Sequence, residues 1–329
     1  MSTNLCRHAL SGATMETRWS ALLYAPPEAD IPALDIALAR AVDRVDNQMS
    51  TWKPDSDLMR FNAASPGTWV SLPRELLQVL ARGLEIGRLS GGAFDIGLGC
   101  LVNAWGFGAA GSVPDTEAIR AVLQEQRPAT HTVLELDTPN ARARKHWEFD
   151  LDLSGIAKGF AVDEMMRIVK SFGLCDALVG LDGELAASGA KPDGTPWRIA
   201  VEKPDYELRS ALGTIELRDA AVATSGDYRH WIEAGGTRLS HTMDRSRGGP
   251  IDNAIAAVSV VAPNCMEADA WATALMVLGP KQAGALAEKH AFDALLVERR
   301  AGALRQIGIG RVFEAASPAL SRAPESLPL

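Results

Sequence analysis

The 329-residue sequence has few cysteines, and their arrangement excludes two common ways of stabilising a fold. Its four cysteines, Cys6, Cys100, Cys175 and Cys265, are scattered along the chain, and no two of them form a C-x-x-C pair. A disulfide framework or a structural zinc site would need paired or clustered cysteines. We therefore expect four free thiols in a reducing compartment.

An excess of positive charge and long apolar runs are also missing. The chain has 33 lysines and arginines against 41 aspartates and glutamates, which gives a net charge of −8. An acidic chain without a basic cluster is a poor partner for nucleic acid. No apolar run approaches the ~20 residues that a membrane-spanning helix needs. These absences predict no nucleic-acid partner and no transmembrane segment.

The first residues lack the features that direct export. Residues 1–12 contain no apolar core of a signal peptide, and no lipoprotein-type segment precedes Cys6. We expect a cytoplasmic protein, or a periplasmic one if the sequence represents a trimmed chain.

Residues 147–171 are the stretch around which the rest of the chain is organised. From Trp147 to Ser154 apolar and polar residues alternate, which predicts a strand, and helical spacing of apolar residues follows up to Gly173. The turn between them brings Asp152, the peptide groups around Gly155, and Lys158 to one helix N-terminus. Such a corner suits a phosphate and a divalent metal. The alternative is a surface turn with solvated charges.

The remaining pattern predicts a mixture of helices and strands. Helices are expected at 31–49, 70–89, 115–126, 267–279 and 280–290, with Ser71 as the N-cap of the second. Strands are expected at 14–24, 177–181, 197–202, 212–217, 221–224, 255–262, 292–297 and 303–313, with a hairpin around residues 235–236. This order favours an α+β fold with mixed or antiparallel sheets and helices packed around them. We expect a single domain over 1–313, built as two interlocked halves, and a loose tail over 314–329.

A glycine-rich segment, residues 91–111, has very few charges. We expect it to be buried or wrapped around a ligand, because glycine lets the backbone approach closely. Residues 106–111 form a literal G-x-G-x-x-G, but that fingerprint indicates a dinucleotide site only when it follows a buried strand and opens a helix. Pro114 comes three residues later. A nicotinamide site is therefore not expected here.

Two further pairs of polar residues have the spacing of a chemical site. Asp269 and Thr273 are four residues apart on a predicted helix and share one face, where they suit a hard cation. The alternative is an aspartate stabilised by the helix dipole and a threonine packed through its methyl group. His241 and Asp244 suit a general base with a carboxylate partner, or a simple loop hydrogen bond. Ser225 does not lie in a G-x-S-x-G elbow, so a serine hydrolase has little support.

Seven segments, taken in order, resemble the FAD:protein FMN transferase (ApbE) family. Asp152-Leu-Ser-Gly-Ile-Ala-Lys-Gly159, for example, matches the family's D-L-S/G-G-I-A-K-G. The segments are residues 12–17, 50–52 with 55–62, 93–108, 152–159, 224–228, 241–244 and 268–273. The resemblance runs from about residue 12 to about residue 279, and it implies an ApbE-like fold with two halves around a flavin cleft.

The resemblance also implies a role for individual residues. FAD is expected to contact Met15, Trp52, Ala93, Phe94, Asp95, Asp152, Lys158 and Met243. Mg²⁺ is expected to bind the carbonyl of Gly155 and the side chains of Asp269 and Thr273. His241, oriented by Asp244, is expected to act as the base.

The chain departs from the family pattern at a few of these positions. Glu16 replaces a glycine of the first motif, and Trp52 replaces a tyrosine. Ala272 stands where some members have a second metal-site aspartate. Arg245 and Arg247 replace the proline and the threonine of a loop that the family writes D-P-R-T-G. We expect these two cations to bear most on the loop conformation and on target recognition.

The activity that the resemblance implies is a magnesium-dependent transfer. FAD and a threonine or serine hydroxyl of a target protein would give phosphoester-linked FMN and AMP, with Lys158 holding phosphate oxygens. The expected partners are FAD and an acceptor protein that carries a Thr/Ser flavinylation motif. One alternative is an FAD pyrophosphatase, in which water is the acceptor. The other is a flavin-binding protein without chemistry.

Overall fold

The computed structural model describes residues 5–15, 17–109, 111, 113–124, 127–234, 236–300 and 303–314. Glu16 lies outside the described residues, and so does the expected C-terminal tail apart from residue 314.

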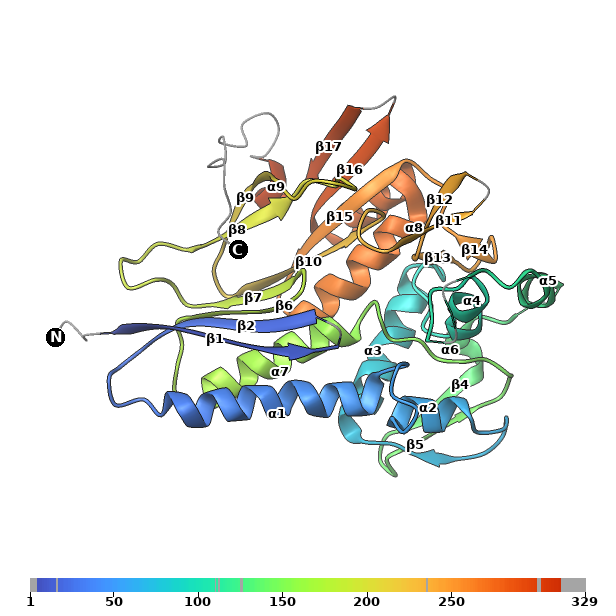
Figure 1. Cartoon of the computed structure of the whole chain (residues 1–329), viewed down its shortest axis with the longest axis horizontal. Coiled ribbons are helices and arrows are strands. Elements are labelled where there is room, and N and C mark those ends of the chain that lie inside the picture. Colours follow the sequence, from blue (N-terminus) through green and yellow to red (C-terminus); the bar gives the residue numbers. More distant parts are fainter. Residues whose placement is uncertain are drawn as a thin grey trace.

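An eight-stranded antiparallel sheet crosses the centre of the molecule (Figure 1). All eight residues of its strand β15 are buried, which explains why this apolar run does not alternate. The strand order is β1-β2-β6-β7-β10-β15-β16-β17, and each neighbouring pair is antiparallel. In that order the strands are Cys6–Thr14, Thr17–Ala25, Ala177–Leu181, Glu184–Ser188, Ala220–Gly226, Ile255–Ala262, Asp293–Arg300 and Ala303–Ile309.

Three long helices cover one face of this sheet. They are α1 (Ile31–Met49), α7 (Ala157–Ser171) and α8 (Cys265–His290), and their apolar side chains form the main core with the sheet. Asp30 caps α1, because its carboxylate accepts a hydrogen bond of 3.0 Å from the backbone N–H of Ala33. The α8 helix is interrupted at Gly279, which has φ 73° and precedes Pro280. The two consecutive helices predicted there are thus confirmed.

A two-stranded ribbon covers part of the other face. Strands β8 (Trp197–Glu202) and β9 (Ala211–Leu217) pair with each other and pack on the sheet together with α9 (Arg311–Glu314). Trp197 is buried in this second core, and its indole N–H donates to the carbonyl of Ser188 at 3.0 Å. The layers are therefore helix, sheet and ribbon. This arrangement confirms the predicted α+β class, whereas the predicted domain limits stay a prediction.

Short elements gather at one end of the molecule together with the 16-residue helix α3 (Figure 1). The helices are α2 (Asp57–Asn62), α3 (Arg74–Leu89), α4 (Gly99–Ala104), α5 (Thr116–Gln124) and α6 (Thr130–Val133). The strands are β3 (Val70–Ser71), β4 (Leu134–Asp137), β5 (Arg142–Lys145), β11 (Trp231–Ala234), β12 (Thr237–Ser240), β13 (Met243–Asp244) and β14 (Gly249–Pro250). The β11–β12 hairpin is the one that the sequence predicts. Within the described part of the chain, no helix combines the length and the apolar character needed to cross a bilayer.

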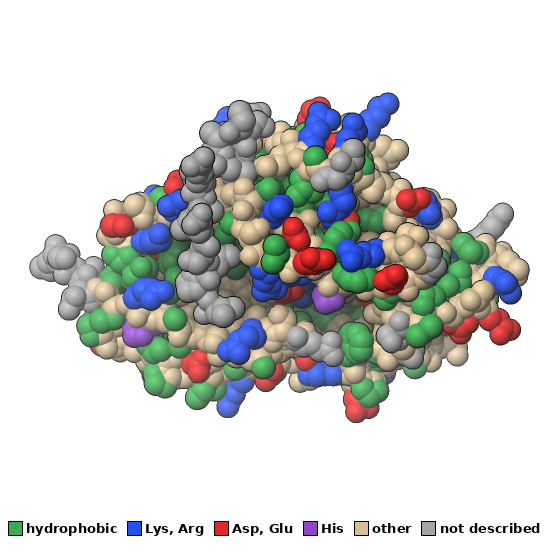
Figure 2. Space-filling model, turned by 45° about the horizontal axis from the view of Figure 1, so that its top comes forward, with side chains coloured by type: hydrophobic (Ala, Val, Ile, Leu, Met, Phe, Trp, Pro, Cys, Tyr) green, Lys and Arg blue, Asp and Glu red, His purple; other side chains and the backbone are tan. Residues whose placement is uncertain are grey.

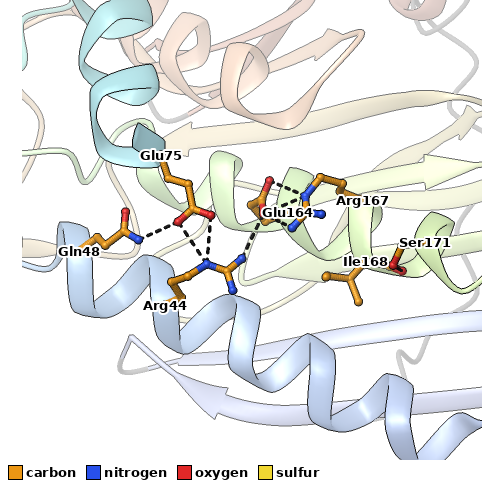
Figure 3. A network of polar contacts seen from close by, with 7 residues as sticks. All are labelled: Arg44, Gln48, Glu75, Glu164, Arg167, Ile168 and Ser171. Carbon is orange, nitrogen blue, oxygen red and sulfur yellow. Dashed lines mark hydrogen bonds and ion pairs between the residues drawn. The ribbon is translucent and has the colours of Figure 1, made fainter. Parts of the chain in front are cut away.

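A polar network ties α1, α3 and α7 together (Figure 3). The guanidinium of Arg44 on α1 donates to Glu75 on α3 at 3.1 Å and to Glu164 on α7 at 3.3 Å. Gln48 donates to the same Glu75 at 2.7 Å, and Arg167 donates to Glu164. Because the Arg44 side chain is 39% exposed, this network contributes mainly to the orientation of the helices.

The closest helix contact is the crossing of α7 and α8 at Gly159. A Cβ atom added to Gly159 would lie 2.4 Å from the carbonyl oxygen of Cys265, so only glycine fits. Asp163, one turn further along α7, accepts hydrogen bonds from the backbone N–H groups of Cys265 at 2.7 Å and Met266 at 2.9 Å. The start of α8 is therefore anchored directly on α7.

Four details of the predicted secondary structure are wrong. Residues 147–153 form no strand, because the backbone groups of Asp150 and Asp152 bond instead to the irregular segment around Ile96 and Gly99. The helix predicted over 70–89 begins at Arg74, since Val70–Ser71 pairs with β5 as strand β3. The strand predicted at 14–24 starts at Thr17 as β2, and β1, which was not predicted, precedes it. The last predicted strand ends at Ile309, where α9 follows.

We predict that Gly159→Ala destabilises the fold by about 2 kcal/mol or more, because the added methyl group forces two packed helix backbones apart. Urea unfolding followed by circular dichroism measures this loss. Gly284→Ala on α8 is the matched control, since nothing lies within 4 Å of its Cβ position. The control should raise stability by up to about 1 kcal/mol. Equal stability of the two variants would contradict the close contact.

Candidate functional site

A cavity of about 1240 Å³ opens where α7, α8 and the sheet meet the short elements. Figure 2 shows a hollow in this face with a histidine side chain at its base and lysine or arginine side chains beside it. All predicted site residues except Asp244 line the cavity. The predicted residues that line it are Met15, Trp52, Ala93, Phe94, Asp95, Asp152, Gly155, Lys158, His241, Met243, Asp269 and Thr273.

The turn before α7 forms one wall of the cavity. The carboxylate of Asp152 accepts hydrogen bonds from the backbone N–H of Ser154 at 2.9 Å and from its hydroxyl. The next residue, Gly155, lies against α8, because a Cβ atom there would be 3.0 Å from the Oγ1 atom of Thr273. A larger residue at 155 would therefore push against the threonine hydroxyl. The turn and α8 meet as the sequence predicts.

Asp269 lies on α8, and its buried carboxylate faces the start of α7. The residue is 4% exposed, and its Oδ2 atom accepts a hydrogen bond of 3.0 Å from the N–H of Gly159. Burial raises the pKa of Asp269 to about 8, and the charge of Glu184 adds to this effect, while Lys158 opposes it. The charge of Lys158 therefore compensates this carboxylate only in part. A cation placed beside it would favour its charged form.

Lys158 is paired with a residue that the sequence analysis missed. Its ammonium lies 2.9 Å from Glu184 and 3.6 Å from Asp182. Burial alone lowers the pKa of Lys158, but Glu184, Asp269 and Asp182 outweigh it and hold the pKa above its usual range. The lysine is therefore charged. Burial also raises the pKa of Glu184, and the charge of Lys158 opposes that shift.

The signal for Glu184 was present in the sequence. Asp182-Gly183 separates two short apolar runs, which is the pattern of a tight hairpin turn. The structure pairs Leu181 with Glu184 across this turn, with Asp182 at φ 54°. Both carboxylates are thereby delivered to the start of α7.

His241 is held by the backbone of a neighbouring residue. Its Nδ1 atom lies 3.0 Å from the carbonyl oxygen of His230. Because a carbonyl only accepts, Nδ1 carries the proton in the neutral ring, and Nε2 is left as the basic atom. The pKa of His241 is lowered to about 4, mainly by desolvation and also by the charges of His230 and Lys158, while the hydrogen bond to His230 opposes the shift. The ring is therefore neutral over the physiological range.

Asp244 does not orient His241 as expected. Its carboxylate accepts hydrogen bonds from the backbone N–H of Ser246 at 2.8 Å and from the hydroxyl of Ser246 at 2.7 Å. Asp244 thus shapes its own loop, and the predicted pairing is replaced by the contact of His241 with His230. A catalytic role for Asp244 stays a prediction.

The loop that follows carries the two unexpected arginines. Arg245 lies 3.4 Å from the buried carboxylate of Asp95, which also accepts from the N–H of Gly97 at 2.9 Å. Arg247 pairs with Asp252 at 2.8 Å. Arg245 and Asp95 line a second cavity of about 530 Å³, and Asp95 also lines the main one. The substitution at 245 therefore joins the loop to the wall of the main cavity.

Among the described residues, no group of three or more His, Cys, Asp or Glu side chains could hold a metal ion. The set present is of another kind, with one carboxylate, one hydroxyl and one backbone carbonyl, from Asp269, Thr273 and Gly155. Oxygen ligands with few carboxylates suit Mg²⁺, which keeps several positions for water and phosphate. Position 272 adds no side-chain ligand, since the methyl group of Ala272 has no donor atom, and the residue is fully buried.

Comparison with known proteins gives the family. A model of the ApbE family matches residues 15–296. The chain belongs to the ApbE family. It is 37% identical over 292 residues to the FAD:protein FMN transferase of Vibrio cholerae, covering 88% of this chain and 86% of that protein. It is 32% identical over 298 residues to that of Escherichia coli K12, covering 88% and 84%. The predicted family and the predicted enzyme class, a flavin transferase, are thereby confirmed.

Solved ApbE structures share the fold. The flavin transferase ApbE from Vibrio cholerae superposes with a TM-score of 0.84 at 33% identity, covering 94% of this chain and 99% of that one. The apo form of the Pseudomonas stutzeri flavinyl transferase ApbE superposes with a TM-score of 0.83 at 35% identity, covering 94% and 96%.

We predict that His241 titrates at about pH 4, because the ring is removed from water beside other cations. Its ring should stay neutral above about pH 5. Two-dimensional NMR of the imidazole nitrogens measures this, with His241→Asn to assign the signal. The tautomer with the proton on Nδ1 is expected. Titration near pH 6.5 would contradict the lowered pKa of the ring.

Proposed function

We propose that this ApbE protein is a magnesium-dependent FAD:protein FMN transferase. It attaches FMN from FAD to a threonine or serine of an acceptor protein through a phosphoester bond and releases AMP. One observation carries the proposal. A single cavity collects the start of α7, the oxygen set on α8 and a neutral histidine with a free Nε2 atom.

The cavity offers different surfaces to the two ends of FAD. Phe94 and Met243 are apolar lining residues that are each 5% exposed, whereas Trp52 is 54% exposed at the cavity. These side chains suit a flat aromatic ring. The start of α7 and Lys158 suit the diphosphate, because a helix N-terminus and an ammonium both favour negative charge.

The oxygen set fits a magnesium ion. Asp269 is a buried carboxylate whose pKa is raised by burial and by the charge of Glu184, and the Oγ1 atom of Thr273 lies against Gly155. The side chain of Asp269, the hydroxyl of Thr273 and the carbonyl of Gly155 would hold Mg²⁺. The bound ion would neutralise charge on the diphosphate oxygens during transfer.

The histidine supplies the proton acceptor. In the proposed step the acceptor hydroxyl oxygen bonds to the phosphorus of the FMN half of FAD. The bond from that phosphorus to the oxygen of the AMP phosphate breaks, and the hydroxyl proton passes to Nε2 of His241. The carbonyl of His230 fixes the tautomer that leaves Nε2 free. Lys158 holds phosphate oxygens while negative charge develops.

One incubation tests the proposed activity. The purified protein is mixed with FAD and MgCl₂, with and without a test acceptor that carries a D-[ST]-[GS]-A-[TS] segment. Flavin fluorescence of the denatured acceptor and release of AMP are measured. We expect covalent flavin on the acceptor and stoichiometric AMP. FMN and AMP formed equally without acceptor would make the protein a pyrophosphatase, and unchanged FAD would make it a binding protein.

His241→Ala separates binding from chemistry in the same assay. Because His241 takes the proton and does not contact the diphosphate corner in the described structure, this variant should still bind FAD. Transfer should fall about 100-fold or more, which is the usual contribution of a positioned base. Loss of FAD binding together with transfer would argue against a role as base.

We predict that Asp269→Asn lowers magnesium-dependent transfer about 100-fold or more, because the metal loses its only carboxylate. The fold should be kept, since the amide still accepts from Gly159 and a buried charge is removed. Initial rates over a Mg²⁺ series and thermal unfolding measure the two effects. Asp163→Asn is the control, because Asp163 anchors α8 without lining the cavity. Full activity of Asp269→Asn at low Mg²⁺ would reject the metal site.

A further inference from the structure

Glu184 is a buried acid that the proposed chemistry leaves unused. It is 2% exposed, and one carboxylate oxygen, Oε1, lies 2.9 Å from the ammonium of Lys158. The other oxygen, Oε2, is buried and has no hydrogen-bond partner among the described residues. The residue lines the main cavity. An unpartnered buried oxygen beside a ligand cavity needs an explanation, because it costs free energy that a surface residue would not lose.

The surroundings of Lys158 make this corner negative. Asp182, Glu184 and Asp269 all place carboxylates near one ammonium. Asp182 and Glu184, which both lie within ion-pair distance of Lys158, already outnumber it. His241 and Cys265 also sense the charge of Lys158, and neither of them adds a positive charge at neutral pH. A free diphosphate would therefore meet a lysine whose charge is already compensated.

We propose that Glu184 is a positioning residue of the diphosphate corner: it fixes the ammonium of Lys158, and its charge makes FAD binding depend on a bound divalent cation. Without the cation, the carboxylate repels the diphosphate. With the cation on Asp269, Thr273 and Gly155, the excess negative charge of the corner is neutralised, so the diphosphate is no longer repelled, and Glu184 keeps Lys158 in place beside it. This inference rests on the proposed use of FAD and Mg²⁺.

The two roles of Glu184 predict opposite effects of one substitution. Glu184→Gln keeps the size of the side chain and an oxygen that can accept from Lys158, but it removes the negative charge. FAD binding in EDTA should become about tenfold tighter, because one repulsive charge near the diphosphate is lost. Turnover with saturating FAD and Mg²⁺ should fall about tenfold, because a neutral acceptor holds the ammonium less firmly. If Glu184 had a purely structural role, the substitution would weaken FAD binding in EDTA as well as turnover.

Flavin fluorescence titrations in EDTA and in MgCl₂, together with turnover and thermal unfolding, test this on the full chain. Glu184→Asp keeps the charge and shortens the reach, so it should preserve the metal dependence of FAD binding and lower turnover. Glu298→Gln is the matched control. Glu298 is a buried glutamate, 1% exposed, that pairs with Arg300 outside both cavities. It should leave both FAD affinities and turnover within about twofold of the parent.

The outcomes separate this inference from the proposed function. Unchanged or weaker FAD binding in EDTA for Glu184→Gln would overturn the charge role, and unchanged turnover of Glu184→Asp would overturn the positioning role. If Glu184→Gln does not fold, Glu184→Asp still tests the positioning role. The charge role is then tested on the parent protein, and it is rejected if the parent binds FAD equally tightly in EDTA and in MgCl₂. Metal-dependent FAD binding without any transfer to an acceptor would reject the proposed function and leave the inference standing.

Discussion

The contact on which the site depends is the crossing of α7 and α8 at Gly159. There the N–H of Gly159 donates to Asp269, a residue 110 positions away in the chain, and the carbonyl of Cys265 lies where a side chain would be. This one approach sets the start of α7 against the face of α8 that carries Asp269 and Thr273. It also brings Gly155 onto Thr273. The site is thus supported by two packed helices rather than by mobile loops, which keeps its geometry well defined.

The same contact creates a conflict of charge. The N-terminus of α7 favours anions, but Asp269 already uses one of its N–H groups. Without a cation, the carboxylate competes with an anionic ligand for this end of the helix, and burial beside Glu184 raises its pKa. A cation bound to Asp269 removes the competition, because the carboxylate then holds a positive charge beside the helix end. A metal and a diphosphate would therefore support each other's binding in this corner.

Local patterns in the sequence predicted the residues of the site better than their partners. The Asp152–Lys158 turn and the Asp269–Thr273 helix face follow from turn chemistry and helical periodicity, so both could be found without coordinates. The pairing of His241 with His230 could not be predicted, because every residue has a backbone carbonyl and the sequence does not show which one the ring contacts. Glu184 escaped notice because the strand that begins with it, β7, was not predicted. The apolar alternation of residues 147–153 indicates burial correctly, yet burial does not require a neighbouring strand.

The unexpected arginines lie in a different part of the site from His241. His241 is fixed by the carbonyl of His230 and by an edge contact with Phe107, whose ring centre lies 6.4 Å away. Arg245 instead contacts Asp95 on the wall between the two cavities, and Arg247 pairs within its own loop. Among the described residues, no hydrogen bond or ion pair links either arginine to His241. The two arginine substitutions therefore bear on the cavity wall at Asp95, whereas the position of His241, the proposed proton acceptor, depends on His230 and Phe107.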